Sequence, residues 1–221
     1  MSELLPPSSL LAAFAAASVV LALTPGPGVV YIITRSIAQG RRSGLASVAG
    51  VALGNLVNAI AAACGLAALF AVSATAFMLV KFAGAAYLIY LGIRLLLRMP
   101  NTTAAAGDTA TQGRRVFRDG LIVALFNPKT TIFFAAFLPQ FMSSNADPMV
   151  QGLTLGTMFV AIAAVTDSIY ALTAGAITPW LQRAKGRRRS GRYLVASLFI
   201  GLGLFTALGG SQRTANAWTL P

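Results

Sequence analysis

The chain contains no histidine, a single cysteine and only five acidic residues among its 221 residues. The lack of histidine excludes histidine metal sites, histidine general bases and histidine proton relays. Cys64 has no second cysteine to pair with, which excludes an internal disulfide and a paired-cysteine electron carrier. The sequence also has no cluster of metal-ligating residues and no glycine-rich phosphate loop, so we expect neither a metal nor a cofactor.

Charged residues are scarce as well. They make up 10% of the chain, hydrophobic residues make up 57%, and the mean hydropathy is +0.75. Since a soluble domain carries about 25% charged residues, this composition excludes soluble, disordered and fibrous proteins and indicates an integral membrane protein. The net charge of +12 does not indicate a nucleic-acid partner, because nearly all basic residues lie between apolar runs.

Six apolar segments are long enough to cross a bilayer, for which a helix needs about 20 mostly apolar residues. They lie near residues 10–34, 44–72, 77–97, 118–142, 149–178 and 193–211. The sequence therefore predicts an all-α polytopic membrane protein with six transmembrane helices in a lipid bilayer. Basic residues gather in the first, third and fifth connections, and such residues collect on the cytoplasmic side of a membrane. We therefore expect both termini to face outward.

The two halves of the chain repeat one another, which divides it into residues 1–98, a polar linker over residues 99–116, and residues 117–221. Landmark residues recur at similar offsets: Pro25 with Pro128, Gly50 and Gly54 with Gly152 and Gly156, and Lys81 and Gly92 with Arg192 and Gly203. Because each half has an odd number of spans, the second half is predicted to be inserted upside down. Such inverted three-helix repeats are a recurring plan in secondary transporters.

The pairs Gly50–Gly54 and Gly152–Gly156 place small residues one helical turn apart, which lets helix backbones approach closely. We assign these four glycines to helix packing. The same surfaces would also serve a homodimer, so the sequence leaves the oligomeric state open.

The first span is interrupted at Thr24-Pro25-Gly26-Pro27-Gly28. A proline removes a backbone donor and clashes with the carbonyl four residues earlier, so the two prolines should release the carbonyls of Leu21 and Leu23. Unpaired backbone groups are tolerated in a membrane only against protein or a water-filled cavity. This segment is therefore predicted to line a cavity.

The fourth span carries Asn127-Pro128-Lys129 at the equivalent place, where Pro128 should release the carbonyl of Ala124. A lysine at the centre of a membrane helix costs about 2.5–3.5 kcal/mol, which favours a functional or paired Lys129. The alternative is that the span begins later and that the Lys129 side chain extends to the cytoplasmic interface.

Two broken helices suit the recognition of a zwitterion. The half-helix after a break presents free N–H groups that bind a carboxylate, and the carbonyls released before the break bind an ammonium. Asn55 and Asn58 share one face of the second span, where they either line the same cavity or bond between helices. The candidate substrate-binding residues are Pro25, Gly26, Pro27, Gly28, Asn55, Asn127, Pro128 and Lys129.

Asp167 is the only carboxylate deep inside a predicted span. An acid inside the membrane is a functional candidate by default, and without histidine in the chain Asp167 is the obvious proton carrier. The alternative is a structural role, in an ion pair or in a hydrogen bond to Thr166 or Ser168.

Three motifs together resemble the LysE/RhtB family of amino-acid exporters. They are Thr24-Pro25-Gly26-Pro27 in the first span, Lys81-x-x-Gly84-Ala85-x-Tyr87-Leu88-x-Tyr90-Leu91-Gly92 in the third, and Asn127-Pro128-Lys129 with Phe133-Phe134 and Pro139-Gln140-Phe141 in the fourth. The resemblance implies efflux of amino acids or close derivatives across the bacterial inner membrane, driven by the proton-motive force. Because the predicted cavity has only one acid, we expect a neutral or small polar amino acid such as threonine, homoserine or leucine.

Other functions fit the sequence less well. A membrane-embedded enzyme usually needs clustered acids or histidine, so we expect no enzyme. Efflux of a metal cation would need several oxygen or nitrogen ligands. A carrier for another small molecule stays open, whereas a non-transporting scaffold would leave the paired prolines, Lys129 and Asp167 unexplained.

Overall fold

The computed structural model describes residues 5–64, 74–97, 109–143, 146–177 and 187–208. All regular elements in these ranges are helices. In chain order they are α1 (Ser8–Leu23), α2 (Pro27–Gln39), α3 (Arg41–Ala63), α5 (Ala74–Leu97), α6 (Thr109–Leu125), α7 (Pro128–Ile132), a π-helical turn η1 (Phe133–Phe137), a 3-10 turn η2 (Leu138–Phe141), α8 (Pro148–Ala176) and α10 (Arg187–Leu208). The protein is therefore all-helical over the described residues.

Two of the long apolar segments are broken. Helices α1 and α2 meet at an angle of 50°, and α6 meets the segment from α7 to η2 at 44°. Helices α3 and α8 are continuous and long enough to cross a membrane. By length and composition, the described residues thus hold two membrane-crossing helices, or four if each bent pair is one span. The six spans expected from the sequence stay a prediction.

Both breaks have the same local cause. Thr24 and Asn127 are extended, with ψ of 118° and 105°, because a proline ring disfavours the helical conformation of the residue before it. Pro27 and Pro128 then occupy the first position of the next helix, where a missing N–H costs nothing. Each break therefore ends one helix and starts another within a few residues.

Two predicted boundaries differ from the structure. Helix α6 begins at Thr109, so residues 109–116 of the predicted linker are helical. The polar residues there suggested a loop, but alanine, glutamine and arginine are good helix formers and this turn extends from the apolar body of α6. Helix α3 ends at Ala63. The remainder of the second predicted span, to residue 72, lies almost entirely outside the described residues.

Helices α3 and α8 form the centre of the molecule, with α6 packed on α3 and with α1 and α2 packed on α8. The predicted glycine pairs lie at these contacts. A Cβ at Gly50 would stand 2.1 Å from the carbonyl oxygen of Phe117 on α6, and one at Gly156 would stand 2.6 Å from Cβ of Ala59 on α3. A Cβ at Gly54 would lie 2.6 Å from Cβ of Ala124, and one at Gly152 would lie 3.0 Å from Cα of Ala63. A larger residue at any of the four would force the helices apart.

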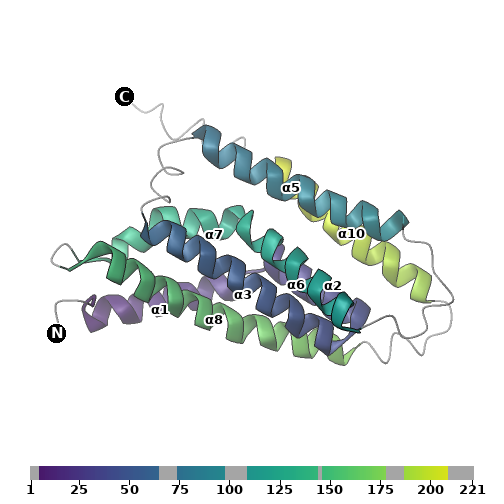
Figure 1. The fold of residues 1–221 in the computed structure, drawn as a ribbon, viewed down its shortest axis with the longest axis horizontal. Coiled ribbons are helices and arrows are strands. Elements are labelled where there is room, and N and C mark those ends of the chain that lie inside the picture. Colours follow the sequence, from purple (N-terminus) through teal and green to yellow (C-terminus); the bar gives the residue numbers. More distant parts are fainter. Residues whose placement is uncertain (1–4, 65–73, 98–108, 144–145, 178–186, 209–221) are drawn as a thin grey trace.

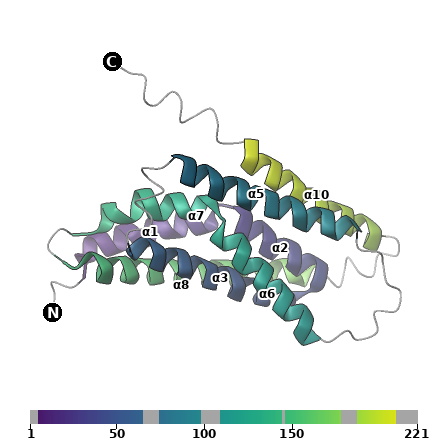
Figure 2. The same cartoon turned by 45° about the horizontal axis from the view of Figure 1, so that its top comes forward.

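Helices α5 and α10 pack on each other along one side of the molecule (Figures 1 and 2). Their closest contacts are reciprocal. A Cβ at Gly92 would lie 2.9 Å from the Ala196 oxygen and 2.6 Å from Cγ1 of Ile200. A Cβ at Gly203 would meet the corresponding atoms of Ala85 and Ile89 at 2.8 and 2.7 Å. The two helices are therefore antiparallel, and each presents the same surface to the other.

The core consists of two apolar clusters, one towards each end of the bundle. The first joins α2, α3, α5, α6, α8 and α10 around Tyr31, Ile32 and Phe199. The second joins α1, α3, η1, η2 and α8 around Phe14 and Phe133, whose ring centroids are 5.7 Å apart. Gly26, Gly28 and Asn127 at the two helix breaks are buried, whereas Leu23, Thr24 and Pro25 are exposed, so protein covers the first break on one side only.

The arginine-rich helix ends lie together. The α2–α3 junction, the start of α6 and the end of α8 share one end of the bundle (Figure 1). In agreement, a Cβ at Gly175 would lie 3.0 Å from the backbone of Arg41, and the Tyr31 hydroxyl donates to the carbonyl of Val116. The described basic residues of these ends are Arg35, Arg41, Arg42, Arg114, Arg115 and Arg118.

Candidate substrate site

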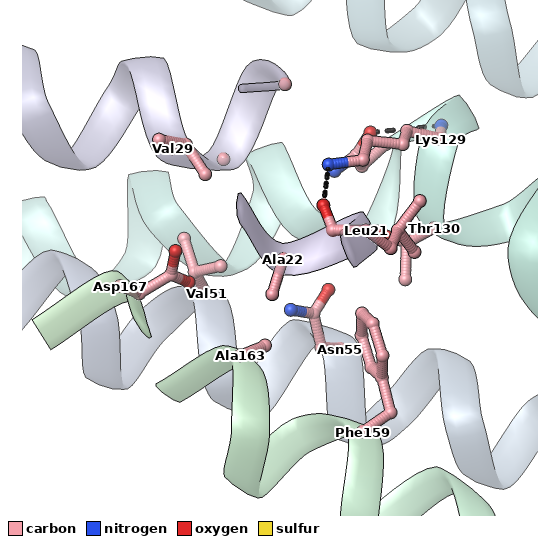
Figure 3. A pocket seen from close by; sticks show the side chains of 13 residues that line it. Leu21, Ala22, Val29, Val51, Asn55, Lys129, Thr130, Phe159, Ala163 and Asp167 are labelled. Carbon is pink, nitrogen blue, oxygen red and sulfur yellow. Dashed lines mark hydrogen bonds between the residues drawn. The ribbon is translucent and has the colours of Figure 1, made fainter. Parts of the chain in front are cut away.

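Residues of both helix breaks line one cavity (Figure 3). Its volume is about 30 Å³, which is room for one or a few water molecules. Residues of α1, α2, α3, α7 and α8 line it: Leu21, Ala22, Gly26, Gly28, Val29, Val51, Asn55, Asn127, Lys129, Thr130, Phe159, Ala163 and Asp167.

The cavity brings together residues predicted from distant parts of the sequence. The predicted residues among its lining are Gly26, Gly28, Asn55, Asn127, Lys129 and Asp167. Pro25, Pro27 and Pro128 are not part of the lining, and they act on it through the helix breaks that they cause. The cavity also has an apolar wall that was not predicted from the sequence, and its residues Phe159 and Ala163 belong to the second core cluster. No sequence signal separates these two residues from other apolar positions of α8.

The carbonyls that the prolines release all have partners. The Lys129 ammonium donates to the Leu21 oxygen at 2.6 Å and also to the Thr24 oxygen. The Tyr170 hydroxyl donates to the Leu23 oxygen at 3.0 Å. The Asn58 amide donates to the Ala124 oxygen at 2.9 Å. The breaks are therefore held by three side chains from other helices, Lys129, Tyr170 and Asn58, and the sequence alone could not pair any of them with the carbonyls.

The two helix starts at the cavity differ. The Asn127 side chain accepts from the Lys129 amide at 3.1 Å and caps α7. The start of α2 has no such side-chain cap. Gly28 and Val29, which follow Pro27, belong to the cavity lining. The first turn of α2 therefore offers N–H groups and the positive end of a 13-residue helix to the cavity.

The cavity also contains acceptors that lack donors. The Oδ1 atom of Asn55 is buried and has no hydrogen-bond partner in the part of the chain that the structure describes. Asp167 is 5% exposed, and no hydrogen bond or ion pair joins it to another described residue. The hydroxyls of Thr166 and Ser168 bond to backbone carbonyls of their own helix instead. Among the described residues, Asp167 therefore makes neither an ion pair nor a hydrogen bond to Thr166 or Ser168.

A second buried carboxylate, Asp119 on α6, lies near the basic end of the bundle and was not singled out in the sequence. It is 3% exposed. Its carboxylate forms an ion pair with the Arg35 guanidinium at 3.2 Å and accepts a hydrogen bond from the Tyr87 hydroxyl at 3.2 Å. This contact joins α2, α5 and α6. Asp119 stands near the start of its predicted span, and no periodicity links it with Arg35, 84 residues earlier in the chain.

Long apolar helices, two broken spans and a buried polar cavity between them define a helical membrane transporter. The comparison with known families agrees with this class. The chain belongs to the LysE-type translocator family, whose family profile matches residues 19–210. It is therefore a multi-pass membrane transporter and not an enzyme.

Similar proteins come from several bacteria. A homoserine/homoserine lactone efflux protein of Salmonella typhimurium is 35% identical over 88% of this chain and 94% of its own length. A membrane protein of Vibrio cholerae is 31% identical over 88% of this chain and 95% of its own length. A leucine efflux protein of Salmonella choleraesuis is 27% identical over 83% of this chain and 88% of its own length. No solved structure matches the chain.

Proposed function

We propose that this transporter exports amino acids or their close derivatives across the bacterial inner membrane, driven by the proton-motive force. The substrate is a neutral or small polar amino acid of the threonine, homoserine and leucine class. The names of the homoserine and leucine efflux relatives support this class. The observation that carries the proposal is the cavity between the two helix breaks, which offers donors on one side and acceptors on the other.

The site recognises both charged groups of an amino acid. The substrate carboxylate lies against the uncapped start of α2, where Gly28 and Val29 supply N–H groups. The ammonium lies at the carboxyl end of α1 and takes over the Leu21 and Thr24 oxygens, which accept from the Lys129 ammonium, in place of the predicted Leu21 and Leu23 oxygens. The substrate side chain faces the apolar wall formed by Phe159 and its neighbours.

The transport path follows from a six-span topology. The described helices occur twice in the order broken span, long helix, long helix, which supports two inverted repeats over residues 1–98 and 117–221 joined by residues 99–116. The arginine-rich end of the bundle faces the cytoplasm and both termini face outward. A homodimer is compatible with this arrangement, since the exposed apolar faces of α5 and α10 include residues such as Tyr90 and Phe205.

Transport requires the cavity to change its size. A volume of about 30 Å³ has room for water but not for an amino acid, so the cavity has to expand when a substrate binds. Because the helices are interrupted at the cavity, α1 and α2 can tilt independently of each other, and so can α6 and α7. Alternating access then consists of opening the cavity first to the cytoplasm and then to the outside.

Asp167 couples transport to protons. Its carboxylate is the acid of the cavity lining, and without a bonding partner among the described residues it is free to bind and release a proton. A proton binds from the outside after substrate release and leaves to the cytoplasm when the carrier has returned. The proton gradient thereby drives the return of the empty carrier.

Uptake into everted membrane vesicles tests this function. Vesicles that contain the protein should accumulate labelled homoserine or leucine when a proton gradient is imposed, and a protonophore should abolish the accumulation. Asp167→Asn should lose gradient-driven accumulation but keep exchange of labelled for unlabelled substrate. Asp147→Asn, which changes an exposed acid at the start of α8, is the matched control and should behave as the wild type. Accumulation that survives the protonophore or Asp167→Asn would rule out the coupling.

A further inference from the structure

The Lys129 ammonium occupies the place that a substrate ammonium would take. It comes from α7 in the second half of the chain and donates to the Leu21 and Thr24 oxygens at the carboxyl end of α1. Figure 3 shows the side chain reaching from its own helix to Leu21 across the break. A cation is favourable there because the end of a helix carries a partial negative charge. The contact therefore has the chemistry of an ammonium subsite that is already filled.

Gly26 makes room for this contact. A Cβ at this position would lie 2.9 Å from Cδ of Lys129, so any larger residue would push the lysine chain aside. The backbone of Gly26 is extended, with φ of −138° and ψ of −174°, which every residue can adopt. Position 26 therefore favours glycine because a Cβ would crowd the Lys129 side chain, and not because the backbone conformation demands it.

We propose that Lys129 is a tethered occupant of the ammonium subsite, and that substrate binding exchanges the Lys129 ammonium for the primary ammonium of the substrate. In the empty carrier the lysine satisfies the two carbonyls that the broken helix exposes. In the loaded carrier the substrate satisfies them. This inference rests on the proposed function, to which it adds the way in which the empty site is kept closed.

The displaced lysine has other acceptors in the same cavity. The Asn55 Oδ1 atom and the Asp167 carboxylate both lack donors among the described residues and both belong to the lining. Asp167 lies on the other side of the cavity from Lys129 in Figure 3. The cavity therefore has two more acceptors than the empty carrier uses, which is what an exchange between two cations requires.

The exchange also defines the ligand class. The subsite needs a cation that donates at least two hydrogen bonds, one to each carbonyl, so a primary ammonium fits and a quaternary ammonium does not. A simple alkylammonium lacks the carboxylate that would compensate for moving the lysine. It should therefore bind only when the lysine is absent or displaced.

The experiment measures the thermal stability of the purified protein in detergent with increasing methylammonium chloride. Tetramethylammonium chloride, which carries the same charge without N–H donors, keeps the ionic strength constant. Lys129→Ala should be stabilised by methylammonium, with Tm rising by about 3–10 °C near saturation. The wild type should show no rise. Lys81→Ala removes a buried lysine of α5 that is not part of the cavity lining, and it should respond as the wild type.

A folded Lys129→Ala protein that gains nothing from methylammonium, or that gains as much from tetramethylammonium, overturns the proposal. If Lys129→Ala does not fold, Lys129→Met decides, because it keeps a side chain of similar length and removes the ammonium that donates to the Leu21 and Thr24 oxygens. That variant should gain stability from methylammonium, and no gain overturns the proposal. Failure of amino-acid uptake in vesicles would instead refute the proposed function, since the methylammonium assay involves neither an amino acid nor transport.

Discussion

The reciprocal contact between α5 and α10 makes a quantitative prediction about the repeat. Gly92 and Gly203 are separated by 111 residues (203 minus 92), and so are the residues that each one meets on the other helix. If the two helices are related by a two-fold axis, an added methyl group has the same surroundings at both positions. Gly92→Ala and Gly203→Ala should therefore destabilise the protein equally.

The size of the effect follows from the contacts. Each new Cβ would lie within 2.9 Å of a backbone oxygen and closer still to an isoleucine Cγ1, so the helices must separate by a few tenths of an ångström. Overpacking of this kind costs about 1–3 kcal/mol, or a decrease in Tm of roughly 2–12 °C for a chain of this length. The double variant should lose less than the sum of the two, because the first methyl group already moves the helices apart.

Thermal unfolding in detergent measures these changes. Gly201→Ala is the matched control on α10, since a Cβ there meets no atom within 4 Å. It should leave Tm unchanged or raise it slightly, because alanine favours helix by about 1 kcal/mol over glycine. Losses at Gly92 and Gly203 that differ by more than about 1 kcal/mol, or that add fully in the double variant, would refute the two-fold relation.

Three further substitutions test contacts outside the cavity. Asp119→Ala leaves the Arg35 guanidinium buried without its carboxylate and should cost about 3–5 kcal/mol, whereas removing both charges in Asp119→Leu/Arg35→Met should recover much of the loss, as measured by Tm. Gln151→Ala removes a fully buried amide that makes three hydrogen bonds to the loop before α8, so chymotrypsin should cleave this loop faster than in the wild type. Asp147→Ala removes the side-chain cap that accepts from the Val150 amide and should lower stability by about 0.5–2 kcal/mol, and an unchanged Tm would show that the cap is dispensable.

The predictability of the site differs from residue to residue. Both breaks could be located in the sequence, because a proline acts on its own helix and on the residue before it. Asp167 and Lys129 could be identified as unusual, since charges inside apolar segments are costly. Their relation could not be predicted. The Lys129 ammonium donates to carbonyl oxygens of α1, and no ion pair joins it to Asp167 among the described residues.

The buried pair Arg35–Asp119 illustrates what stayed hidden. Both residues stand near the ends of predicted spans, where charged side chains usually face water or lipid headgroups. Burial came from the packing of α2, α5 and α6 around them, together with the Tyr87 hydroxyl. A contact between residues 84 positions apart depends on helix angles, and composition does not determine these angles.

The sequence by itself determined the all-helical membrane class, the positions of both interruptions and the glycines that allow close packing. These features are local, since hydropathy, proline and glycine act within one helix turn or one span. Only the tertiary structure decided which side chains reach the interrupted helices, that a lysine from one half donates to the carbonyls of the other, and that apolar residues line one side of the cavity. The physical reason is that these contacts join distant segments, and their geometry is set by how whole helices pack.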